Sequence, residues 1–174
     1  MKFYILFITL ACVNLMANAQ SSCEDIKKEN EYLKKVLHLN TPVKEIKSED
    51  LTFSITKIEG NSKSQTLTIE LLVTNKGRNL ESFTSRVKSI IDINGTEYGL
   101  NNAYIGSQDA KYFAHTDLLR DTPLKCKYIF KGVQPEIKII KMFRYPFEYH
   151  LPGTNSFDRV KESLEFRDLN IVWK

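Results

Sequence analysis

The sequence is poor in the residues that catalytic and metal sites use most. Its 174 residues include three cysteines, three histidines and one tryptophan. The histidines are scattered, at His38, His115 and His150, and the HExxH, CxxC, GxSxG and P-loop patterns are absent. We therefore predict that the protein is not an enzyme and that it uses no metal and no cofactor.

Two weak constellations remain. His115 and Asp117 are two residues apart, so on a strand both side chains would face the same side. With Asp109 or Asp121 they could bind a cation, although a solvated strand edge beside a loop explains the same residues more simply. Ser107 could be imagined as a nucleophile, but no elbow motif surrounds it, and a polar loop is the simpler interpretation.

Charge of one sign is also limited. Basic residues exceed acidic ones by only four, 25 against 21. Lysines alternate with acids along the chain, whereas nucleic-acid-binding proteins tend to carry a clustered basic stripe. We therefore predict no nucleic-acid partner.

Long apolar runs are scarce, and the run over residues 3–11 is too short to span a membrane. A positive start precedes it and Ala-Asn-Ala follows at 17–19, which is the pattern of a secretory signal peptide over residues 1–19. Cleavage there leaves 155 residues with a net charge of +3, enough for one domain. We predict an exported protein, periplasmic or secreted, without a membrane span. Lipid anchoring at Cys12 is the alternative, because residues 9–12 weakly resemble a lipobox.

Two cysteines remain after this cleavage, Cys23 and Cys126. Disulfides form in oxidising compartments, and an even count favours pairing. We predict a Cys23–Cys126 disulfide that ties the N-terminal segment to the domain. The alternative is a buried free thiol at Cys126 and a mobile one at Cys23.

Residues 22–39 are predicted to form a helix. Ser22 is a suitable N-cap, acidic residues occupy the first turn and lysines the last, and Pro42 follows the end. One interpretation is that this helix packs on its own domain or acts as a spacer. The other is a dimer, through four positions at heptad spacing: Ile26, Asn30, Leu33 and Leu37.

Beyond Pro42 the apolar period changes from helical to two. Alternating or β-branched runs separated by turn signals predict seven or eight strands without helical crossovers. The expected fold is all-β: an immunoglobulin-like antiparallel β-sandwich over residues 50–174, preceded by one N-terminal α-helix. The strands are expected near residues 51–56, 67–73, 87–93, 96–98, 111–118, 124–131, 137–143 and 164–173.

Three of these segments carry a resemblance to a known family. Residues 71–77 (LLVTNKG), 91–98 (IDINGTEY) and 128–133 (YIFKGV) resemble the telokin-like immunoglobulin-fold domains of unknown function, which occur in secreted and lipid-anchored bacterial proteins. The resemblance covers roughly residues 50–143 and implies an immunoglobulin-like fold. It carries over no catalytic residues, and the chain departs from it by its N-terminal helix and by the tail after Phe143.

Aromatic residues are densest in residues 143–153, where Tyr145, Phe147 and Tyr149 alternate. If exposed, these rings would stack on sugars or form an interface. The alternative is that they fill one end of the core. Because Pro146 and Pro152 disfavour regular ladder pairing, we expect an edge or loop position and propose these three rings as the contact surface.

The combined prediction is a non-enzymatic binding or interaction module of the bacterial cell envelope, with a protein or a glycan as partner. One alternative is a structural or oligomeric protein that assembles through its 22–39 helix. Another is a small envelope hydrolase. An exposed aromatic face would favour the first, a free amphipathic helix the second and a converging cleft of histidine and carboxylate the third.

Overall fold

The computed structural model describes Lys28 and residues 42–110, 114–155 and 157–174. The chain divides into two units, Met1–Thr41 and Pro42–Lys174, and the following description concerns the second. The predicted signal peptide and the predicted 22–39 helix, with its dimer positions, lie outside the described residues apart from Lys28. In the described part of the chain, no helix is long and apolar enough to cross a membrane.

Five strands form the first sheet, all antiparallel to their neighbours. The central strand β3 lies between β2 and β9, β1 borders β2, and the second half of β6 borders β9. The period-two pattern of the sequence explains this sheet, because alternate residues of β3 are buried along its whole length. The strands are β1 (Lys44–Ser48), β2 (Leu51–Asn61), β3 (Thr66–Asn75), β6 (Glu97–Ile105) and β9 (Leu124–Lys131).

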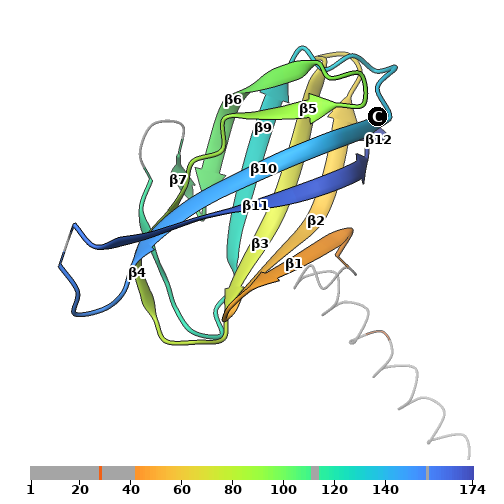
Figure 1. Ribbon diagram of the computed structural model, residues 1–174. Coiled ribbons are helices and arrows are strands. Elements are labelled where there is room, and N and C mark those ends of the chain that lie inside the picture. The colour runs from red at the N-terminus through yellow and green to blue at the C-terminus, as the bar shows by residue number, and fades with distance from the viewer. Residues whose placement is uncertain (1–27, 29–41, 111–113, 156) are drawn as a thin grey trace, which may run out of the picture. The chain divides into compact units, whose positions relative to one another are not determined.

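The second sheet is organised around one long strand, β10. It pairs along its length with β11, and on its other side first with β5 and then with β4, which in turn pairs with β8. Figure 1 shows β10 and β11 running together across the first sheet. The strands are β4 (Leu80–Ser85), β5 (Ser89–Asp92), β8 (Thr116–Leu118), β10 (Ile139–His150) and β11 (Arg159–Asn170).

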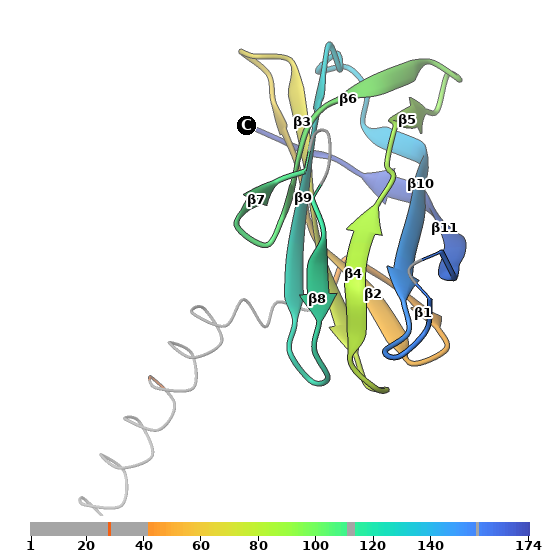
Figure 2. The same cartoon turned by 90° about the vertical axis from the view of Figure 1, so that its left-hand side faces the viewer.

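β6 connects the two sheets. Its first residues pair with β5 and its later ones with β9, with a register shift between Leu100 and Asn102. Two short strands complete the domain: β7 (Gln108–Asp109) pairs with β6, and β12 (Val172–Trp173) runs parallel to β2. The domain is therefore an antiparallel β-sandwich with one parallel strand at its margin, and Figure 2 shows the two layers on edge.

The predicted Asn-Gly hairpin joins β5 to β6. The backbone N–H of Gly95 donates to the Asp92 carbonyl (3.1 Å), and Gly95 has a φ of 85°. This left-handed position favours glycine, as in a three-residue hairpin loop. The Asp92 carboxylate accepts backbone hydrogen bonds from Asn94 (2.8 Å) and Thr96 (2.9 Å), so the turn is fixed from its side as well.

The aromatic segment of β10 lies in the core, which overturns the predicted contact surface. Tyr145, Phe147 and Tyr149 are 0%, 1% and 5% exposed. They continue a row that begins at Phe143, and Phe53 of the opposite sheet packs on it, with ring centroids 5.5 Å from Tyr145 and 4.7 Å from Phe147. The rings do share one face of an extended strand, but that face is the inner one.

Contrary to the prediction, Pro146 does not prevent ladder pairing, whereas Pro152 does lie in a loop. Pro146 lies within β10 opposite Ser163 of β11. The N–H and C=O groups of a strand residue point to the same side, and the Pro146 carbonyl accepts from the backbone N–H of Arg86 (2.7 Å), on the side away from β11. The missing N–H of the proline therefore removes no hydrogen bond from the β10–β11 ladder. Pro152 follows the strand, in the β10–β11 loop.

Cys126 is a free, fully buried thiol, so the structure lacks the predicted disulfide. Cys23 lies outside the described residues. The thiol points into the sandwich from β9, where the Tyr145 hydroxyl donates to it (3.8 Å), and burial raises the pKa of Cys126 to about 11. The even cysteine count does not predict pairing here, because the side chain of Cys126 lies on the inward-facing side of β9.

Candidate functional site

The residues considered for metal binding or catalysis do not converge. His115 is exposed, the carboxylate of Asp117 accepts from the backbone N–H of Ser82 (3.2 Å), and Asp121 pairs with Lys76 (2.8 Å). Among the described residues, no group of three or more His, Cys, Asp or Glu side chains could hold a metal ion.

Two further polar residues keep isolated positions. Ser107 is an exposed turn residue between β6 and β7. His150 is 8% exposed, and its Nδ1 has no hydrogen-bond partner. Neither residue lies among those that line the two concave sites described next.

The first concave site arises from a gap in the second sheet. The β5 ladder with β10 ends at Phe143, and the β4 ladder begins at Phe147. Between them, residues 86–88 pass from β4 to β5. A cleft of about 470 Å³ lies at this gap, and we call it the cationic cleft; its lining residues are Arg86, Lys88, Ser89, Glu97, Arg144 and Pro146.

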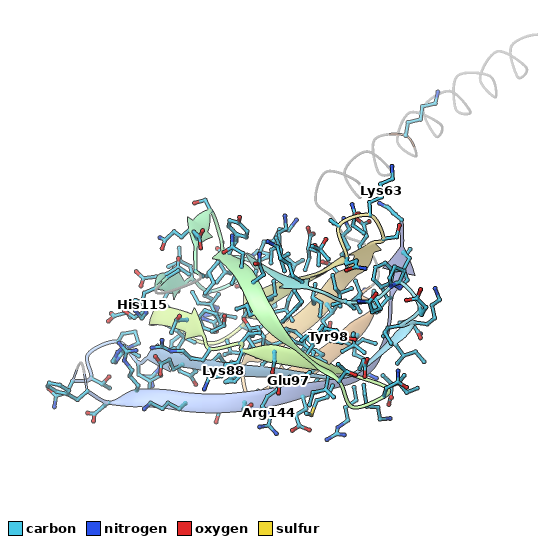
Figure 3. The ribbon with its side chains drawn as sticks, turned by 90° about the horizontal axis from the view of Figure 1, so that it is seen from above. Lys63, Lys88, Glu97, Tyr98, His115 and Arg144 are labelled. Carbon is cyan, nitrogen blue, oxygen red and sulfur yellow. The ribbon has the colours of Figure 1, made fainter. Side chains whose placement is uncertain are left out.

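Positive side chains dominate the cationic cleft. Arg86, Lys88 and Arg144 are all exposed, and Glu97 is the one carboxylate among the lining residues. Figure 3 shows Lys88, Glu97 and Arg144 on the same side of the domain. The Ser89 hydroxyl donates to Glu97, which keeps its negative charge, so three cations and one carboxylate line the cleft.

The two arginines are held in place by carboxylates. Glu148 accepts from Arg86 through Nη2 (2.7 Å) and Nε (3.2 Å), and from Arg159 (2.6 Å). Burial opposes the ionisation of Glu148, but these charge-assisted hydrogen bonds outweigh it, so its pKa lies below the usual value. The Glu165 carboxylate likewise accepts a hydrogen bond from Nη2 of Arg144 (3.1 Å). Lys88, in contrast, forms no ion pair within the described part of the chain.

The second concave site lies where β2, β3, β4 and the last residues of β10 come together. We call it the end pocket; it has a volume of about 330 Å³. Its apolar floor consists of Leu51, Leu80, Leu151, Val160 and the ring of Tyr149. Its polar rim consists of Glu49, Asp50, Asn75 and Arg78.

Tyr149 is thus the one predicted contact residue that lines either of these two sites. Tyr145 and Phe147 lie deeper, and the Tyr145 hydroxyl is satisfied because it accepts from Tyr128 (3.0 Å). Tyr149 is 5% exposed, yet its hydroxyl has no hydrogen bond to any described residue. Burial raises the pKa of Tyr149, and the carboxylates of Glu162 and Glu49 raise it further.

Sequence reasoning missed the cationic cleft. Arg86 and Lys88 share the outer face of an extended segment because they are two residues apart, and this spacing was the available signal. Arg144 comes from a strand almost sixty positions later, and only the pairing of β10 with β5 and β4 brings it beside them.

Comparisons with known proteins place this chain in no family. No protein-family description matches it, and no curated protein does. Among solved structures, it is similar to the yeast GGA1 GAE domain, with a TM-score of 0.43 and 14% identity over 70% of this chain and 94% of that one. It is also similar to a family 123 glycoside hydrolase from Clostridium perfringens, with a TM-score of 0.33 and 11% identity over 66% of this chain and 23% of that one. Likenesses this low support no functional statement about the chain.

Proposed function

We propose that the protein is an exported, non-enzymatic binding module of the cell envelope. Its sandwich is of the immunoglobulin-like class, and it takes an acidic ligand at the cationic cleft. The observation that carries the proposal is that Lys88 lines the same cleft as two arginines, Arg86 and Arg144, which are already oriented by Glu148 and Glu165. Export rests on the predicted signal peptide over residues 1–19.

The charge of the surrounding face favours an anion. Around the cleft, Glu148 is shared by Arg86 and Arg159, and Glu165 is shared by Arg144 and Arg167. With Lys88 and Glu97 included, five cations face three carboxylates. A ligand carboxylate would therefore meet a net positive surface, and Lys88 is the group that gains an ion pair without breaking one.

The strength of such contacts determines which ligands fit. Exposed ion pairs contribute only about 0.2–1 kcal/mol each, so one carboxylate would bind weakly. A ligand with several carboxylates can engage Lys88, Arg144 and Arg86 together and gain from multivalency. We therefore propose a polycarboxylate, on a protein or on a glycan, as the ligand class.

A hydrolase finds less support from the cleft. Glycoside hydrolysis uses two carboxyl groups flanking the scissile bond, and Glu97 is the single carboxylate among the described lining residues. Assembly through the 22–39 helix remains a separate prediction, because that segment lies outside the described residues.

The test is calorimetric titration of the purified protein with two probes, hexaglutamate and a hexamer of galacturonate, at low and at physiological salt. Lys88→Glu and Arg144→Gln are the variants, and Lys131→Gln is the matched control, since Lys131 is exposed and lies outside the cleft. We expect binding that weakens with salt, is lost in Lys88→Glu and is unchanged in Lys131→Gln. Equal binding by all three variants, or no binding of either probe, would contradict the proposal.

A further inference from the structure

We infer that the end pocket binds the protonated amino group of a small apolar amine, such as the first residue of a peptide that begins with an aliphatic side chain. This inference is independent of the proposed function, because the end pocket and the cationic cleft share no lining residue.

The unpartnered hydroxyl of Tyr149 is the first reason. Among the described residues, the one buried side-chain polar atom without a hydrogen-bond partner is the Nδ1 of His150, so the Tyr149 hydroxyl is accessible from the pocket although its ring is buried. Tyr145 and Tyr128, which are fully buried, satisfy their hydroxyls through each other and Ser85. Tyr149 is 95% buried on the same strand face and has no such partner within the described residues. A ligand that donates to this hydroxyl would satisfy it.

The shape of the pocket supplies the second reason. Its floor is apolar, and the Tyr149 ring is fixed by stacking on Phe147 at an interplanar angle of 13°. Its volume of about 330 Å³ lies at the lower end of the range of small-molecule sites, which is about 300–1,000 Å³. The pocket therefore suits a ligand of one or two residues with an aliphatic body.

The charges of the rim select an amine over an acid. Glu49 and Asp50 line the pocket and form no ion pair with any described residue. Glu162 adds a third carboxylate that acts on Tyr149, and it is held by the Ser48 hydroxyl (2.6 Å). Arg78 is the one cation among the lining residues. The carboxylates therefore outnumber the guanidinium, and a ligand ammonium would gain the pairing that the rim lacks.

Arg78 further favours the end of a peptide over a simple alkylamine. A guanidinium donates to carbonyl and carboxylate oxygens. In an amino-terminal residue the carbonyl oxygen lies two bonds beyond the carbon that carries the ammonium. One group of the ligand can therefore face Glu49 and Asp50 while the other faces Arg78, and the side chain lies on the apolar floor.

The probe series for the test varies one charge at a time. Leucinamide is a cation, N-acetylleucinamide is its neutral analogue and N-acetylleucine is an anion with the same side chain. Binding would be followed by amide chemical shifts of the full protein. We expect leucinamide to bind at least about tenfold more tightly than either acetylated probe, since a charge-assisted hydrogen bond contributes about that much.

Three variants at the pocket and two controls outside it locate the site. Glu49→Gln, Asp50→Asn and Tyr149→Phe each should weaken leucinamide binding several-fold, and Glu136→Gln, an exposed acid outside the pocket, should leave it unchanged. Lys88→Gln should also leave it unchanged, which separates this test from that of the cationic cleft. The inference is overturned if N-acetylleucine binds as well as leucinamide, if Tyr149→Phe binds with wild-type affinity, or if calcium binds at these residues and leucinamide does not.

Discussion

The cationic cleft and the end pocket both draw on β10, but they differ in how the protein satisfies their polar groups. In the cleft, Glu148 and Glu165 already orient the arginines, and Lys88 is the lining cation that forms no ion pair with a described residue. In the end pocket, the hydroxyl of Tyr149 forms no hydrogen bond, and the carboxylates of Glu49 and Asp50 form no ion pair, with any described residue. One strand thus contributes to the core and to two concave sites of different character.

The difference predicts two kinds of recognition. Exposed charges act over distances near the Debye length, about 8 Å at physiological salt, and weaken as salt rises. The cleft should therefore respond to the total charge of a ligand more than to its shape. The end pocket offers an apolar floor and the hydroxyl of Tyr149, so it should discriminate between ligands of equal charge by their shape and donors.

The largest loss of stability is expected at Tyr145, whose side chain lies in the core and lines neither concave site. Tyr145→Ala removes a fully buried ring that contacts Phe53, Tyr128 and Phe143. We expect the free energy of unfolding to fall by about 3–5 kcal/mol, measured by urea denaturation. A loss below about 1 kcal/mol would mean that the ring is not part of the core.

A smaller effect is expected at the carboxylate that supports the cleft. Glu148→Gln leaves Arg86 and Arg159 without their shared negative partner. Because both arginines are partly exposed, solvent screens the change, and we expect a loss of about 1 kcal/mol in unfolding free energy. The same variant removes a negative charge from beside the cleft, so hexaglutamate should bind it at least as tightly as it binds the wild type. Unchanged stability would show that the ion pairs of Glu148 contribute nothing to the fold.

The pH dependence of the unfolding free energy gives a second test of the role of Glu148. The pKa of Glu148 in the folded protein lies below its ordinary value of 4.5. Its stabilising contribution is therefore present above about pH 4.5 and is lost as the pH falls through the folded-state pKa. The stability gap between wild type and Glu148→Gln should narrow from pH 6 to pH 3, as followed by denaturant unfolding at each pH. A gap that widens toward acid would contradict the assigned direction.

The smallest change in stability is expected at Tyr149, the last aromatic residue of the row on β10. Tyr149→Phe removes a hydroxyl that forms no hydrogen bond with the described residues, and it keeps the ring stacked on Phe147. The unfolding free energy should change by less than about 0.5 kcal/mol. As a comparison, Tyr145→Phe removes a bonded hydroxyl and should lose about 1 kcal/mol. Equal losses at the two positions would erase the distinction between core and pocket.

The sequence predicted the regular strands well. β3 and β9 show clean period-two alternation, β2 shows it up to a register shift between Ile55 and Lys57, and the Asn-Gly turn between β5 and β6 is recognised from its dipeptide. It failed at β4, where Ser82 has a φ of 51° and the register with β8 shifts between Leu80 and Phe83. That irregularity breaks the alternation on which the prediction depends.

The candidate sites were predicted less well, for two physical reasons. Period-two alternation shows that Tyr145, Phe147 and Tyr149 share a face but not whether that face is inner or outer, which depends on how the sheets pair. The cationic cleft depends on a gap between two ladders on one side of β10. Such a gap depends on which strands pair with β10 in the folded protein, and no local sequence pattern around Arg144 predicts it.

The most direct test of the account is an amide chemical-shift titration of the protein with hexaglutamate at low salt. We expect the largest shifts at residues 86–89, at Glu97, at Arg144 and at Tyr145, which lie at the cationic cleft or next to its lining residues. The amides of Glu49, Asp50 and Arg78 at the end pocket should stay unmoved. Shifts that cluster at the end pocket, or that spread evenly over all exposed lysines, would contradict the claim that the cationic cleft is the acidic-ligand site.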